Sequence, residues 1–103
     1  MLIMKISRWM SEVPATKDLV LKLLEQESLE AKDIAVVAGK KLVNMRTTMT
    51  EVIQLYSGEL IFNLSGTQFV LRPGDRLQMS GNTIYSLNNL RDEPAGFWFA
   101  KTV

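Results

Sequence analysis

The sequence predicts an all-β fold, one sandwich or barrel of short antiparallel strands. From residue 33 onward, short apolar runs recur about every eight to twelve residues, and each is closed by Gly, Asn or Pro. No part of that region has the periodicity of a helix. The length of 103 residues and the 47% hydrophobic content are those of one folded domain. We divide residues 1–103 into an N-terminal segment, 1–32, and a barrel core, 33–103.

Residues 16–29, which precede the predicted strands, fit two structures. As a helix, the segment begins at Thr16 as N-cap and its leucines form one stripe. As a strand over residues 18–26, alternate leucines share one face. We favour the strand slightly, because the strands that follow need an antiparallel partner and residues 27–30 suit a turn. The fold class therefore includes an ambiguous N-terminal strand or helix.

The remaining elements are all predicted as strands. They cover residues 33–38, 51–56, 59–64, 67–71, 76–79, 83–87 and 96–103. The pairs Ser57-Gly58 and Ser65-Gly66 are typical of tight hairpin turns, because glycine readily adopts the positive φ that such turns need.

The final strand carries Trp98 between Phe97 and Phe99. Because side chains alternate between the faces of a strand, large aromatic rings lie on both faces, and both faces need cover. A second subunit would supply the outer cover, which predicts a homodimer, since a short chain gains from burying an extra apolar face. The alternative is that N-terminal residues 1–30 cover this face within one subunit.

The chain has no cysteine and no histidine, which excludes zinc sites built from Cys and His, His-dependent nucleophiles and disulfides. With 12 Lys+Arg against 11 Asp+Glu and one adjacent basic pair, the sequence predicts no nucleic-acid partner. No apolar run approaches the roughly 18 residues that a membrane-spanning helix requires. The apolar start is too short for a signal-peptide core. We expect a cytoplasmic protein with no membrane partner.

The spacing of residues in the central stretch resembles the cupin superfamily. Its first motif is Gly, five residues, His-x-His, three or four residues, Glu, six residues, Gly. Its second motif is Gly, five residues, Pro-x-Gly, two residues, His, three residues, Asn. The fixed points that match in this chain are Gly39, Glu51, Gly58, Gly74 and Asn89. The resemblance covers residues 33–103 and implies a double-stranded β-helix, or jelly-roll, barrel. A generic jelly roll is the alternative.

The departures from the cupin pattern concern the metal. The resemblance places metal ligands at Met45, Thr47, Glu51 and Tyr85, of which only Glu51 is a usual ligand. A soft thioether beside hard oxygen donors does not make a competent site for a divalent first-row metal. We therefore predict no metal and no other cofactor, and the oxygenase and isomerase activities that the resemblance implies lose their main support. Asn82 stands at a glycine position of the second motif and suits it, because Asn tolerates the left-handed conformation.

The barrel interior is the predicted site. Strand alternation and the cupin register place six side chains there: Met45, Thr47, Glu51, Ile53, Tyr85 and Leu87. One interpretation is a ligand pocket, apolar with three polar groups. The other is a filled core, in which Met45 occupies the space of a metal and the Tyr85 hydroxyl holds Glu51. A buried carboxylate needs such a partner.

These observations predict a metal-free, cupin-like protein without a specific assigned function. The leading hypothesis is a homodimeric binding or interaction module for a small polar or sugar-like molecule. One alternative is a metal-independent enzyme that uses Glu51 and Tyr85 for acid-base chemistry, although the sequence leans against an enzyme. The other is a dimeric sensor or subunit that acts through its outer surface.

Overall fold

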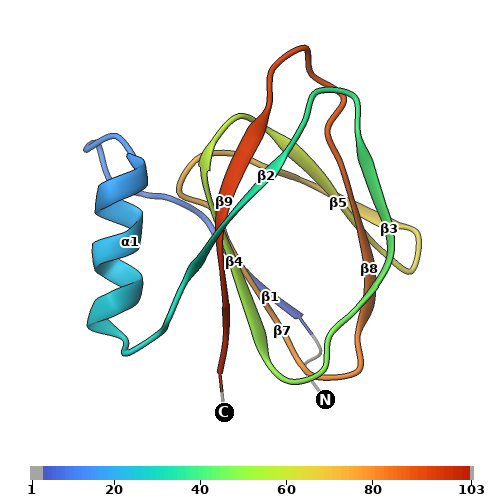
Figure 1. Cartoon of the computed structure of the whole chain (residues 1–103), viewed down its shortest axis with the longest axis horizontal. Helices are drawn as coiled ribbons and strands as arrows, with labels where there is room; N and C mark the ends of the chain where they lie inside the picture. Colours follow the sequence, from blue (N-terminus) through green and yellow to red (C-terminus); the bar gives the residue numbers. More distant parts are fainter. Residues whose placement is uncertain (1–3, 103) are drawn as a thin grey trace.

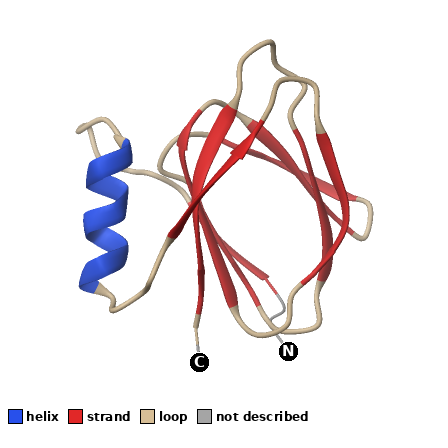
Figure 2. Cartoon of the chain, viewed as in Figure 1, coloured by secondary structure: helices blue, strands red, loops and turns tan. Residues whose placement is uncertain are grey.

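The structure is a computed structural model that describes residues 4–102. Within these residues, nine strands form two antiparallel sheets that face each other as a barrel (Figures 1 and 2). The five-stranded sheet has the order β1 (Met4–Ser7), β7 (Arg76–Met79), β4 (Glu51–Ser57), β9 (Ala95–Lys101) and β2 (Lys32–Val36). The four-stranded sheet has the order β3 (Lys41–Arg46), β8 (Ile84–Asn88), β5 (Leu60–Leu64) and β6 (Thr67–Leu71). The predicted all-β barrel is confirmed.

The main hydrophobic core lies between the two sheets. Ile53 and Leu77 reach it from the five-stranded sheet, and Phe62 and Leu87 reach it from the four-stranded sheet. All four are fully or almost fully buried. Alternation explains the selection, since every second residue of each strand points inward. The barrel is therefore held together by one apolar layer that both sheets share.

The predicted strands agree with the observed ones except at two places. Residues 67–71 and 76–79 form strands with the predicted bounds, and the other predicted strands differ at their ends. The last one was predicted to reach Val103, which lies outside the described residues. The sequence did not predict β1 or β3. A break in pairing between Leu42 and Met45, with Asn44 at φ 54°, interrupts the alternation along β3 and hides it from pattern analysis.

The preference for a strand over residues 18–26 was wrong, and the helical alternative is correct. The helix α1 spans Lys17–Gln26, and the Thr16 side chain caps it by accepting a hydrogen bond from Leu19 N–H. The antiparallel partners that seemed to require a strand here are supplied elsewhere, because β9 pairs with β2 and β7 pairs with β1.

The helix α1 covers the outer face of the five-stranded sheet (Figures 1 and 2). Val20 and Leu24, one turn apart, pack against Val52 of β4 and Trp98 of β9. The Trp98 indole N–H also donates to the carbonyl of Lys17, at 2.9 Å. The aromatic face that the sequence left to a second subunit or to residues 1–30 is thus covered by the chain's own N-terminal segment.

Of the two predicted hairpin turns, one is a hairpin. Ser65 and Gly66, both with positive φ, join β5 to β6, and Leu64 pairs directly with Thr67. Ser57-Gly58 is instead a corner between the sheets, because β4 pairs with β7 and β9 while β5 pairs with β6 and β8. Glycine is required at this corner, since a Cβ on Gly58 would lie 2.8 Å from the Ala95 Cα.

Candidate functional site

The fixed points of the two motifs lie at corners of the barrel. Gly39, Gly58 and Gly74 all have positive φ, and Asn82 takes the same conformation with φ 64°. A left-handed backbone is therefore what these positions have in common. The expectation that Asn82 replaces a glycine for this reason is confirmed.

Asn89, the last residue of the second motif, stabilises the end of the barrel that lies opposite Glu51 and Tyr85. It is fully buried. Its side-chain amide donates to the carbonyls of Val36 and Glu93, at 3.0 and 2.8 Å, and its carbonyl accepts from Arg91 N–H at 2.9 Å. One side chain thus joins the end of β2 to the loop between β8 and β9. Its role is structural.

Met45 and Tyr85 face each other across β3 and β8 at the site end of the barrel. They are paired in register, so their side chains share the inner face of the four-stranded sheet. Tyr85 is buried and packs against Phe62, with ring centroids 5.6 Å apart, whereas Met45 is 37% exposed. Leu87 and Ile53 belong to the core below them. Met45 is therefore the one exposed side chain among the six predicted for the barrel interior.

The Thr47 hydroxyl holds two loops together. It donates to the carbonyl of Ser80 at 2.6 Å and accepts from Thr83 N–H at 2.8 Å. These bonds join the loop after β3 to the turn before β8. The donor of this hydroxyl is used by the protein itself, which leaves it at most an acceptor for any ligand.

Glu51 lies at the start of β4 and is only 4% exposed. Its carboxylate accepts a hydrogen bond from Thr48 N–H, at 3.1 Å. On the neighbouring strand β9 its register partner is Lys101, whose ammonium donates to the Thr48 hydroxyl at 3.1 Å. The interpretation in which the Tyr85 hydroxyl holds Glu51 is not what the structure shows, because the Thr48 backbone holds it. Sequence spacing gave no sign of Thr48 or Lys101, since the contact depends on the loop conformation.

The Tyr85 phenol is close enough to Glu51 to feel its charge. Burial raises the pKa of Tyr85 to about 12, and the negative charge of Glu51 adds to this rise. The phenol therefore stays protonated at neutral pH and acts as a hydrogen-bond donor. Among the described side chains, the one fully buried polar atom without a partner is Gln54 Oε1. The Tyr85 hydroxyl, which has no partner among them either, must therefore touch solvent.

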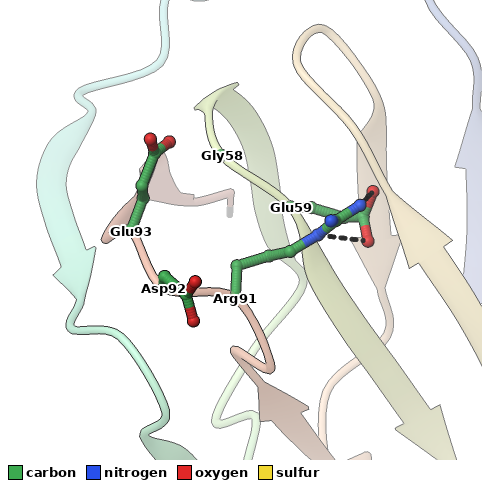
Figure 3. A pocket seen from close by; sticks show the side chains of 5 residues that line it. All are labelled: Gly58, Glu59, Arg91, Asp92 and Glu93. Atoms are coloured by element: carbon green, nitrogen blue, oxygen red, sulfur yellow. Dashed lines mark hydrogen bonds and ion pairs between the residues drawn. The ribbon is translucent and has the colours of Figure 1, made fainter.

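A hollow of about 430 Å³ lies at the opposite end of the barrel and was not foreseen from the sequence (Figure 3). It forms between the corner at Gly58 and the loop that carries Arg91 and Asp92. Arg91 reaches across to Glu59 and binds both carboxylate oxygens, at 3.2 and 3.1 Å, which lowers the pKa of Glu59. Figure 3 shows Asp92 and Glu93 pointing away from this pair. The Arg91 guanidinium in this hollow is thus already paired with a carboxylate of the protein.

The arrangement of these strands is similar to that of known proteins, although the sequence is not. No family model matches the sequence, and no curated protein matches it. Solved structures do match. A cupin 2 domain-containing protein from Halorhodospira halophila has a TM-score of 0.70 and 15% identity, over 100% of this chain and 80% of that chain. A cupin superfamily protein from Desulfitobacterium hafniense has a TM-score of 0.64 and 8% identity, over 97% and 77%. This chain has the cupin fold.

A further match shows how little the cupin fold alone says about function. A de novo designed double-stranded β-helix has a TM-score of 0.55 and 25% identity, over 69% of this chain and 96% of that chain. A fold that a designed protein shares assigns neither a ligand nor a reaction. The function of this cupin-fold chain must be argued from its own side chains.

The side chains at the cupin metal position do not fit a metal. Among the described residues, no three His, Cys, Asp or Glu side chains gather in one place. The Thr47 hydroxyl donates its hydrogen bond to the backbone carbonyl of Ser80. The pKa of the Tyr85 phenol is raised to about 12, so the phenol stays protonated at neutral pH. One carboxylate and one thioether remain, a hard and a soft donor that suit different ions. Separately, no described helix is long and apolar enough to cross a membrane.

Proposed function

We propose that this cupin-fold chain is a metal-independent binding module that holds a small polar ligand at the open end of its barrel. The observation that carries the proposal is Glu51. Its carboxylate is nearly buried, yet within the described residues it takes part in no ion pair and accepts a single hydrogen bond. A buried charge is costly unless several donors satisfy it. A donor group on a ligand would complete the set.

The neighbouring side chains define what such a ligand offers. Glu51 accepts from a ligand hydroxyl or ammonium, and the protonated phenol of Tyr85 donates to a ligand oxygen. Met45 adds a flexible, partly exposed side chain, and Ile53 and Leu87 lie in the apolar core behind these groups. The Thr47 hydroxyl fixes the loop that follows β3. Adjacent donors and acceptors beside an apolar core suit a polyhydroxylated, sugar-like molecule.

A thermal-shift screen of monosaccharides, polyols and small amines against the intact chain tests the proposal. A ligand at about one hundred times its Kd stabilises by about 2.7 kcal/mol and raises the Tm by several degrees. We expect Glu51→Gln and Tyr85→Phe to abolish most of that shift. Glu59→Gln, a carboxylate at the opposite end, is the matched control and should keep it. The proposal fails when no compound shifts the Tm, or when the two site variants bind as well as the parent.

The alternative function is a metal-independent enzyme in which Glu51 is the base and Tyr85 the acid. The raised pKa keeps Tyr85 protonated at neutral pH, as a proton donor must be, and its charge coupling to Glu51 brings the two groups into one site. A binding module returns its ligand unchanged. Incubating each ligand from the screen with the protein and recording its NMR spectrum separates the two functions, because turnover that Tyr85→Phe abolishes would establish the enzyme.

A further inference from the structure

The outer face of the five-stranded sheet is covered by α1 over one half only. The helix packs on β4 and β9, and β7 and β1 continue the same sheet beyond β4 (Figure 1). Two hollows of about 460 and 360 Å³ lie over this half, and both are lined by Glu27, Arg76 and Gln78. We call this continuous depression the furrow. Lys5 and Ser7 of β1 line one side, and Ser28, just after α1, lines the other.

Arg76 lies at the centre of the furrow and lines both hollows. Its side chain is only 20% exposed, and its partner is Glu27, a carboxylate that is itself 46% exposed. A guanidinium carries five N–H donors in a planar fork, and the Glu27 contact is made through Nη1 alone. A largely enclosed cation with a single, half-exposed anion has capacity left for a second one.

The charge and polarity of the lining indicate the kind of ligand. Three side chains with positive charge, Lys5, Arg76 and Lys101, line the furrow together with one negative charge, Glu27. Ser7, Ser28 and Gln78 add hydroxyl and amide groups. Each hollow has the volume of a small-molecule site, which is about 300–1,000 Å³. We propose that the furrow binds a small hydroxylated anion, of the class of sugar acids and sugar phosphates, through Arg76.

Glu27 is the competitor for this site. It follows the last residue of α1 and occupies the guanidinium when no ligand is present. Because its carboxylate is half exposed, it returns to water at little cost when a ligand anion replaces it. Removing this carboxylate should therefore raise the affinity for the ligand.

The hollow at Arg91 offers a comparison, because its arginine is already paired by the protein itself. There the guanidinium is bound by both oxygens of Glu59, and Asp92 and Glu93 line the same hollow. The surplus of negative charge repels an anion. Arg91→Gln is therefore a matched control, since it also removes an ion-paired arginine from a hollow of similar size.

Isothermal titration of the intact chain tests the proposal with four probes: glucose 6-phosphate, gluconate, inorganic phosphate and neutral sorbitol. We expect the two hydroxylated anions to bind, and to bind more tightly than phosphate or sorbitol. Arg76→Gln should weaken their binding at least tenfold, and Glu27→Gln should tighten it several-fold. Arg91→Gln should leave it unchanged, because that arginine lies in the hollow at the other end of the barrel.

Three results would overturn the proposal. One is no binding of either hydroxylated anion at about millimolar concentration. Another is an equal loss in Arg76→Gln and Arg91→Gln, which would indicate general charge attraction. The last is binding of inorganic phosphate as tight as that of glucose 6-phosphate, which would remove the role of the hydroxyl groups. A hexaglutamate peptide is the final probe: if it binds where the sugar anions do not, the furrow is a protein-docking surface.

Discussion

Gly39 and Gly58 have almost the same backbone angle and very different surroundings. Their φ angles are 73° and 78°. A Cβ on Gly39 would meet nothing within 4 Å, whereas one on Gly58 would lie 2.8 Å from the Ala95 Cα and 2.9 Å from the Pro94 carbonyl oxygen. The motif spacing identified both residues, because it reflects local backbone conformation. It could not tell them apart, since close approach depends on which strands meet.

This pair gives a direct prediction for stability. Gly39→Ala should cost about 1–2 kcal/mol, the strain of a left-handed alanine. Gly58→Ala should cost that strain plus about 1–3 kcal/mol for the displacement of neighbouring backbone. Urea unfolding of both variants measures the difference. Equal losses would contradict the close packing at this corner.

The same limit applies to the candidate site. The cupin register, together with alternation along the strands, placed Met45, Glu51 and Tyr85 in the barrel interior, and Met45 and Tyr85 are register partners in the structure. The partner of Glu51 could not be predicted, because Thr48 N–H points at the carboxylate only in the folded loop. Arg76 was assigned to a strand without any role, because its partner Glu27 is nearly fifty residues away in the sequence.

Among the elements, α1 shows where pattern analysis is ambiguous. Its leucines satisfy both a period of two and a period of about 3.6. The outer face of β4 and β9 decides between them, because the helical period brings Val20 and Leu24 to one face, where they pack on Val52 and Trp98. The strand β3 was missed for the opposite reason, since its bulge at Asn44 removes the alternation.

A charged cluster at the first turn of α1 predicts how its docking depends on pH. Lys17 pairs with Asp33 of β2 at 2.8 Å and lies over the rings of Tyr56 and Trp98. Hydrogen bonds from Lys17 and then Tyr56 hold the pKa of Asp33 below its usual value. A lowered pKa in the folded state stabilises above the unfolded pKa, and this contribution is lost as the pH falls through the folded one.

Asp33→Asn should therefore lower the Tm at neutral pH, and the difference from the parent should shrink as the pH falls below about 4 and close once Asp33 is protonated in the folded state. Thermal unfolding followed by circular dichroism across this range is the measurement. Glu25→Gln, an exposed carboxylate of the same helix, should show a smaller difference at neutral pH. A gap between Asp33→Asn and the parent that does not close at acid pH would contradict the role of the ion pair.

For the whole molecule, the number and spacing of strands were enough to predict the barrel, because closed β folds need short strands at regular intervals. The oligomeric state was harder to predict. The homodimer was predicted from the outer face of β9, and α1 already covers that face. The dimer stays a prediction, and its interface must lie elsewhere. Val43 and Ile84, both exposed on the outer face of the four-stranded sheet, are the available apolar residues there.

Sedimentation of the intact chain tests the dimer. We expect twice the mass of 11.7 kDa, and a return to the single-chain mass in Ile84→Lys. Leu90→Lys, an exposed apolar residue in the loop at the opposite end, is the control and should stay dimeric. A single-chain mass for the parent protein would end the proposal.

The pairing of β1 with β7 also sets the order in which the chain can fold. Met4 pairs with Met79 and Ser7 with Arg76, so the first strand must wait until roughly 70 further residues have been synthesised. Most other pairings also join distant segments, and such high contact order slows folding because loop closure comes before the contacts that reward it. The hairpin at Ser65-Gly66 is the exception. Folding should therefore start there, and β1 is the strand that waits longest for its partner during synthesis.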